Sequence, residues 1–199
     1  MKFKETGLPD IDIIKRAYDF AARSPFPLET SLEQDGLPVI YKMLEFGKGL
    51  EPEFIAASLL MYSQLRQSAS DVIGTIFGEE VAQYSKELGV VNTPVPIFRH
   101  LRESPNHVRQ YALAVSISAM EYLQQQADFV SIMDGHIWDD PSKEEMFITM
   151  QLVGDSVMPT DTDLDFQFNM SSTFLSYDLY QWQSKNPKPP KNDNGFKPK

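Results

Sequence analysis

The chain contains no cysteine among its 199 residues. Disulfide bonds, zinc sites built from thiolates and a catalytic cysteine are therefore all excluded. Basic residues are also few, because 18 Lys and Arg face 28 Asp and Glu, which gives a formal net charge of −10. A nucleic-acid-binding protein needs a basic face that releases phosphate counterions. The composition therefore argues against a nucleic acid as the partner.

Long apolar runs and several common chemical motifs are absent as well. No stretch approaches the roughly 18 apolar residues of a membrane helix, and no apolar segment follows Met1. Because these apolar segments are missing, we expect a soluble, cytoplasmic protein with no membrane-inserted segment. The phosphate-binding patterns GxxxxGKS/T and GxGxxG and the nucleophile pattern GxSxG do not occur either.

The sequence does contain a regular series of helical patterns separated by proline and glycine. Hydrophobic residues make up 42% of the chain, which is enough to form a core. Apolar residues recur at helical spacing, and prolines stand at helix starts, where their missing N–H is tolerated. The pattern predicts helices over residues 10–23, 37–46, 52–62, 70–77, 79–88, 106–133, 140–154 and 172–183. The side chains expected in the core include Tyr18, Ile55, Leu59, Leu60 and Val115.

The segment before the last predicted helix has a different periodicity. Leu164, Phe166, Phe168 and Met170 alternate with polar residues. A period of two favours an extended strand. The predicted fold is therefore an all-α helical bundle with a C-terminal extension that includes one short extended segment.

The chain divides most simply into three parts. Residues 1–155 are expected to form the helical domain, and residues 156–184 a C-terminal elaboration packed on it. Residues 185–199 carry five lysines, one aspartate and four prolines, a charge of +4 that leaves −14 on the rest of the chain. Such a composition buries too little apolar area to fold, so we expect a disordered tail. The tail could be a solubilising or simply unselected extension, or it could be a short docking peptide or a targeting signal that another protein recognises.

Four short stretches, taken in order, resemble the landmarks of one enzyme family. They are AYDFAA at 17–22, GLPVI at 36–40, EFIAASLL at 53–60 and IFGEEVA at 76–82. In order and spacing they are similar to the HD-type hydrolase domain of the bifunctional ppGpp (alarmone) synthetase/hydrolase enzymes, over about residues 8–125. The resemblance implies an HD-like helical bundle. In that family a divalent metal generates the hydroxide that attacks a pyrophosphate ester.

The residues that serve the metal site in that family are replaced in this chain. The first family histidine falls on Lys42, and the His-Asp pair falls on Met61 and Tyr62. The Glu-Asp pair that follows falls on Leu65 and Arg66. None of these side chains is a usual ligand of Mn²⁺ or Mg²⁺. The resemblance therefore predicts a catalytically inactive HD-like domain with no metal and no cofactor.

The replaced residues could still bind an anion. Lys42 and Arg66 are cations, and together with Tyr62 they could hold the phosphate of a nucleotide or an alarmone without any metal. In the alternative arrangement, both cations lie on solvated helix faces or pair with neighbouring glutamates. The sequence leaves both arrangements open.

A different metal site would lie in the stretch DGHIWDD. Asp134, His136, Asp139 and Asp140 have the residue types of a metal cluster, and a metal-dependent phosphohydrolase with this atypical site is the alternative function. These residues lie between two predicted helices, where Asp and Gly form turns and Asp140 can cap the next helix. The structural role is the favoured interpretation.

The predicted function is therefore a noncatalytic, adaptor-like module that binds a protein or regulates one. Residues 128–165 contain ten carboxylates and one lysine, which suits a partner with basic segments. Leu164, Phe166, Phe168 and Met170 could form an apolar anchor beside those carboxylates. In the competing interpretation these side chains bury the last helix against the domain, and the sequence does not decide between the two.

Overall fold

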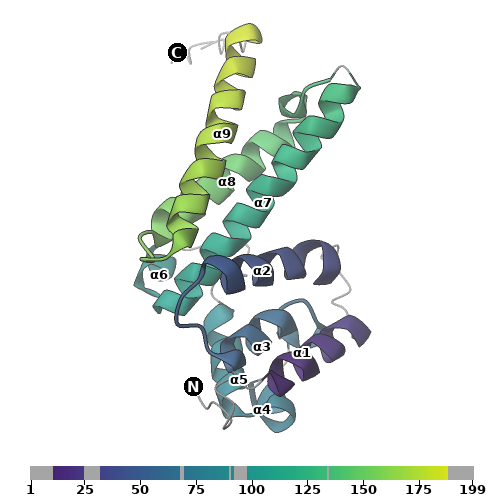
Figure 1. The fold of residues 1–199 in the computed structure, drawn as a ribbon, viewed down its shortest axis with the longest axis vertical. Coiled ribbons are helices and arrows are strands. Elements are labelled where there is room, and N and C mark those ends of the chain that lie inside the picture. Colours follow the sequence, from purple (N-terminus) through teal and green to yellow (C-terminus); the bar gives the residue numbers. More distant parts are fainter. Residues whose placement is uncertain are drawn as a thin grey trace, which may run out of the picture.

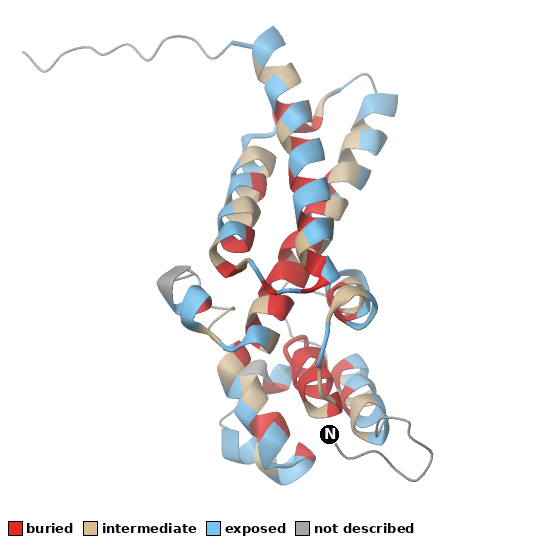
Figure 2. Ribbon diagram, turned by 60° about the vertical axis from the view of Figure 1, so that its left-hand side comes forward, coloured by how far each residue is buried: buried red, intermediate tan, exposed pale blue. Residues whose placement is uncertain are grey.

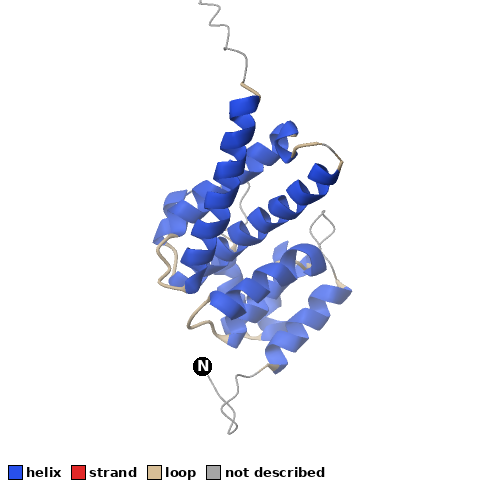
Figure 3. Cartoon of the chain, turned by 45° about the horizontal axis from the view of Figure 1, so that its top comes forward, coloured by secondary structure: helices blue, strands red, loops and turns tan. Residues whose placement is uncertain are grey.

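The structure is a computed structural model that describes residues 11–24, 32–67, 70–89, 91, 98–133 and 135–187. Within these ranges the chain forms α-helices joined by loops and short helical turns, without a strand, as Figure 3 shows. The predicted all-α class is confirmed for this part of the chain. The helices are α1 (Asp12–Arg23), α2 (Leu37–Phe46), α3 (Pro52–Leu60), α4 (Ser70–Phe77), α5 (Glu79–Leu88), α6 (Phe98–Glu103), α7 (Asn106–Ile132), α8 (Pro141–Val157) and α9 (Asp163–Lys185).

Helix α7 joins two groups of helices. In Figure 1, α1 to α5 lie together in the lower half of the molecule, and α8 and α9 run beside α7 in the upper half. In the lower group, α3 packs against α1, α2 and α5. In the upper group, α7 packs against both α8 and α9, and it also contacts α2 from the lower group.

Proline, aspartate and glycine mark helix ends where the sequence predicts them. Pro52 and Pro141 occupy the first turns of α3 and α8. The side chain of Asp140 accepts a hydrogen bond from the backbone N–H of Ser142 at 2.9 Å, which caps α8. Gly78 separates α4 from α5 with a φ of 99°, a conformation that side-chain-bearing residues rarely adopt.

Helix α3 is the most deeply buried element of the fold. Every residue from Pro52 to Leu60 is buried except Glu53, which is half-buried. In Figure 2 the buried residues cover α3 and the N-terminal half of α7, and they alternate with exposed residues on α9. The prediction that Ile55, Leu59 and Leu60 lie in the core is confirmed.

The core prediction is wrong for Tyr18, whose side chain is 37% exposed. Helix α1 packs on α3 through the fully buried Ala17 and Ala21 instead. Small residues let two helix backbones approach closely, which leaves the bulky neighbour at the edge of the contact. Val115 on α7 is only partly buried and packs against the core from its border.

The predicted extended segment is also wrong, because its residues form the first turns of α9. Leu164 and Phe168 are buried, whereas Phe166 and Met170 are exposed. Residues four apart share one face of a helix, so two opposite apolar faces produce an apparent period of two. The last helix therefore begins at Asp163 rather than at residue 172. Most of the predicted tail, residues 188–199, lies outside the described residues.

Candidate functional site

The outer side of α9 carries a row of large apolar side chains, which we call the outer face. Its members are Phe166, Met170, Phe174, Tyr177 and Tyr180. Their side chains are between 57% and 66% exposed. At about 100° per residue they fall within roughly a third of the helix circumference, opposite the buried side of α9. By the same geometry, no charged residue lies on this face between Phe166 and Ser184.

A network of hydrogen bonds positions the N-terminal end of α9. The carboxylate of Asp165 accepts hydrogen bonds from the backbone N–H of Thr160 and of Asp161, each at 3.0 Å. The side chain of Arg109 on α7 donates to the carbonyl of Pro159 at 2.9 Å. The side chain of Asn106 donates to the carbonyl of Thr160 at 3.1 Å. The turn before α9 is therefore tied to the first turns of α7.

Two indole groups fix the other end of α9. The Nε1 of Trp138, a fully buried residue, donates to the carboxylate of Asp178 on α9 at 2.7 Å. In the reverse direction, the Nε1 of Trp182 on α9 donates to Asp139 at 3.1 Å. These bonds hold the buried side of α9 inward. The outer face consequently stays directed away from the helices that α9 packs on.

The DGHIWDD stretch supplies these structural contacts. The backbone N–H of His136 donates to Asp139 at 3.0 Å, and the His136 Nε2 lies 3.7 Å from the Asp178 carboxylate. The hydrogen bonds from Ser142 lower the pKa of the Asp140 carboxyl, which stabilises its charged, capping form. Within the ranges that the structure describes, no three His, Asp or Glu side chains are grouped so that they could hold a metal ion. Asp134 lies outside those ranges.

Two of the predicted phosphate ligands, Lys42 and Tyr62, contact α7 at separate points. The Lys42 Nζ lies 2.6 Å from the Glu121 carboxylate and 5.4 Å from the centre of the Phe46 ring. Tyr62 is buried, and its hydroxyl accepts a hydrogen bond from Tyr111 at 3.4 Å. Glu121 and Tyr111 are ten residues apart on α7, about 15 Å along the axis. The side chain of Arg66 is not among the described ones.

A half-buried polar cluster joins α3, α5 and α7. The Tyr84 hydroxyl donates to Glu51 at 2.8 Å, and the His107 Nε2 lies 2.7 Å from the Glu87 carboxylate. The rings of Phe54, Tyr84 and His107 meet edge to face, with centres 4.7 to 5.4 Å apart. Burial, the hydrogen bond to Glu51 and the nearby carboxylates raise the pKa of Tyr84 to about 12. The sequence interpretation did not find this cluster, because its members are far apart in the chain.

Sequence reasoning also missed Tyr177 and Tyr180 as members of the outer face. The spacing of Phe166, Met170, Phe174 and Tyr177 is 4, 4 and 3 residues, which is a helical stripe. That signal was present in the sequence, but the expectation of a strand over 164–170 concealed it.

Comparison with known proteins finds no family model, curated protein or solved structure that matches the chain. Among the helices described by the structure, none combines the length and the apolar character that crossing a membrane requires. The roles of the candidate sites are therefore inferred from the geometry described above.

Proposed function

We propose that this protein is a noncatalytic interaction module that binds a protein partner through the outer face of α9. The observation that carries the proposal is the position of five large apolar side chains on the solvent side of a helix whose other side already packs on the core. Because these five side chains are exposed to solvent, they do not stabilise the fold by burial. Contiguous exposed apolar residues of this kind are typical of protein interaction sites.

The proposed partner contacts the outer face with an apolar helix or extended segment that carries basic residues at one end. The outer face offers aromatic anchors and no charge, so it favours an apolar surface. The exposed Asp161 and Asp163 lie beside its N-terminal end. A chain with a net charge of −10 also attracts a basic partner over a longer range. Leu164 and Phe168, by contrast, are core residues and take no part in this surface.

The experiment compares two double variants in a pull-down from the source organism and in sedimentation equilibrium. Phe166→Ser with Phe174→Ser removes two anchors of the outer face. Tyr41→Ser with Leu44→Ser removes two apolar side chains from α2 that are at least as exposed as Phe174, and it is the matched control. We expect the first variant to lose the partner and the control to retain it, while both keep the melting temperature of the unmodified protein.

Two results would contradict the proposal. Equal loss of the partner from both variants would show that binding depends on general surface hydrophobicity. A wild-type protein that sediments as a dimer and becomes monomeric only in the outer-face variant would show that a second copy occupies α9. Under the proposal, added salt slows association because it screens the carboxylates, and it has little effect on dissociation.

We also propose that the helices form an HD-like bundle, and the sequence resemblance supports this part of the proposal. The alternative function, a metal-dependent phosphohydrolase, would use the side chains of Asp134, His136, Asp139 and Asp140, of which Asp134 lies outside the described residues. Those of Asp139 and Asp140 accept the structural hydrogen bonds described above. We therefore favour the interaction module.

A further inference from the structure

A groove lies between the C-terminal end of α7 and the start of α8, and we call it the α7 groove. Its volume is about 400 Å³. Gln126 and Val130 line it from α7, and Ile137, Asp139 and Asp140 line it from the turn that leads into α8. An apolar protein cavity of about 150 Å³ is large enough to hold benzene. The α7 groove therefore has room for an aromatic side chain and for the residues beside it.

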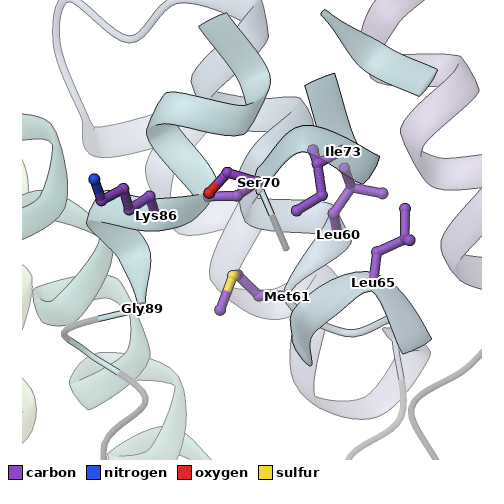
Figure 4. A pocket seen from close by; sticks show the side chains of 8 residues that line it. Leu60, Met61, Leu65, Ser70, Ile73, Lys86 and Gly89 are labelled. Atoms are coloured by element: carbon purple, nitrogen blue, oxygen red, sulfur yellow. The ribbon is translucent and has the colours of Figure 1, made fainter. Parts of the chain in front are cut away.

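A smaller pocket of about 160 Å³ lies between α3, α4 and α5. Leu60, Met61 and Ile73 contribute to its apolar lining. Figure 4 shows that the ammonium group of Lys86 points away from the other side chains that line this pocket. The smaller pocket therefore gives no indication of a ligand, in contrast to the α7 groove, which has two carboxylates at its edge.

The edge of the α7 groove is acidic and open to solvent. Asp139 and Asp140 both line the groove and are exposed. The Asp139 carboxylate accepts the hydrogen bonds described above, but a carboxylate has about four acceptor positions and can bind a further donor. The surrounding stretch, residues 134–145, contains five carboxylates and one lysine. This excess of negative charge favours a cationic occupant.

The end of α9 lies beside the α7 groove. The Nε1 of Trp182 donates to the Asp139 carboxylate at 3.1 Å. Helix α9 ends at Lys185, three residues after Trp182, which is about 4.5 Å along the helix axis. Residues 188–199, which lie outside the described residues, follow directly. Twelve residues span up to about 40 Å, so this segment is long enough to enter the groove of its own chain.

Residues 188–199 also have the composition that suits this groove. They contain four lysines and one aspartate, which gives a charge of +3, and one aromatic residue, Phe196, which is followed by Lys197. A lysine next to an aromatic ring matches carboxylates next to an apolar lining. The outer face of α9 matches it less well, because it carries no charged residue between Phe166 and Ser184.

We propose that residues 188–199 dock in the α7 groove of the same chain. The Phe196 ring packs on Val130 and Ile137, and the lysines beside it lie next to Asp139 and Asp140. A segment that starts this close to its site has an effective concentration in the millimolar range, so even a weak contact is enough to occupy the groove. Docking covers the groove, and a basic peptide of another protein has to displace the segment to bind there. The assignment uses none of the outer face and goes beyond the proposed function.

The first test uses disulfide formation in the full chain, which has no cysteine of its own. Asn194→Cys is combined with Gln126→Cys, in the groove, or with Gln125→Cys, at the adjacent exposed position of α7, as the matched control. Each rate is divided by the rate at which glutathione disulfide modifies the same α7 cysteine. We expect the groove pair to close within the monomer at least about tenfold faster than the control pair. Non-reducing electrophoresis and mass spectrometry measure this.

Three results of this test would overturn the proposal. Equal rates for the two pairs would show that the segment does not occupy the groove. Fastest closure between Asn194→Cys and Tyr180→Cys would place the segment on the outer face of α9. A disulfide-linked dimer in place of the closed monomer would show that the segment of a second copy occupies the groove.

The second test changes the segment in the groove pair. Phe196→Ser should slow disulfide formation about tenfold, because it removes the apolar anchor. Asn192→Ser, the matched control in the same segment, should leave the rate unchanged. Lys197→Gln with Lys199→Gln should slow it about threefold, because the attraction to Asp139 and Asp140 is reduced. An unchanged rate with Phe196→Ser, or equal slowing by Phe196→Ser and Asn192→Ser, would overturn the assignment.

Discussion

Helices α3 and α9 both carry many large apolar side chains, but they use them differently. Helix α3 is short and buried on all sides, because α1, α2 and α5 surround it. Helix α9 is 23 residues long and packs on α7 and α8 through one side, so its second apolar side faces outward. The apolar content of a helix therefore does not show whether it belongs to the core or to the surface of this protein. What decides this is the number of helices that pack around it. The second apolar side of α9, which no other described helix covers, is the feature that suggests a binding role.

The largest effect that tests this comparison is expected within α9 itself. Phe168→Ala should lower the free energy of unfolding by about 3–5 kcal/mol, because it leaves a cavity beside α8. Phe166→Ala should change it by less than about 0.5 kcal/mol, because that ring faces outward. Urea denaturation of both variants measures the difference. Similar losses in the two variants would place Phe166 in the core and remove the basis for the outer face.

A second pair of substitutions tests the buried helix. Leu59→Ala in α3 should cost about 2–5 kcal/mol of unfolding free energy, since Leu59 is 2% exposed. Leu44→Ala in α2 removes the same atoms from a side chain that is 61% exposed, and it should cost less than about 0.5 kcal/mol. The two denaturation midpoints check this expectation. A small loss for Leu59→Ala would mean that α3 is not the centre of the fold.

The contact between α8 and α9 depends on a glycine. A Cβ at Gly154 would collide with the ring of Phe168, so Gly154→Ala forces the two helices apart. Helix propensity alone favours alanine by about 1 kcal/mol. We nevertheless expect a net loss of about 1–3 kcal/mol, because overpacking outweighs propensity here. Gly74→Ala in α4 is the control, since a Cβ there meets only ordinary contact distances and should not destabilise the protein.

The smallest effect is expected at high pH. The pKa of Tyr84 is raised from 10.0 to about 12, so the folded state favours the protonated phenol. The stability that this preference contributes is complete below pH 10.0 and is lost as the pH rises through about 12. Tyr84→Phe should therefore lose less stability than the unmodified protein over this pH range, as measured by urea midpoints. Tyr180→Phe, on the outer face, should follow the unmodified protein.

Much of the local structure could be predicted from the sequence. Pro52 and Pro141 mark helix starts because a proline lacks the N–H that an interior position needs, and this holds in any surroundings. The period of two over 164–170 misled the prediction, because a strand with one buried face and a helix with two apolar faces give the same local pattern there. Only the longer stripe through Phe174 and Tyr177 distinguishes them.

The candidate site could be predicted in part. The sequence indicated the region around Phe166 and Met170, but it also included Leu164 and Phe168, which are buried. Which side of α9 faces the core depends on contacts with residues such as Gly154 in the preceding helix. No local pattern encodes that choice, because both sides of the helix are apolar.

The sequence by itself determined where most helices begin and end, and it determined the excess of negative charge. Both depend on single residues and their near neighbours. The tertiary structure alone decided the pairs that connect distant segments, such as Lys42 with Glu121 and Trp138 with Asp178. The physical reason is that these pairs, and the separation of α9 into a buried and an outer side, arise only when helices far apart in the chain exclude water between them.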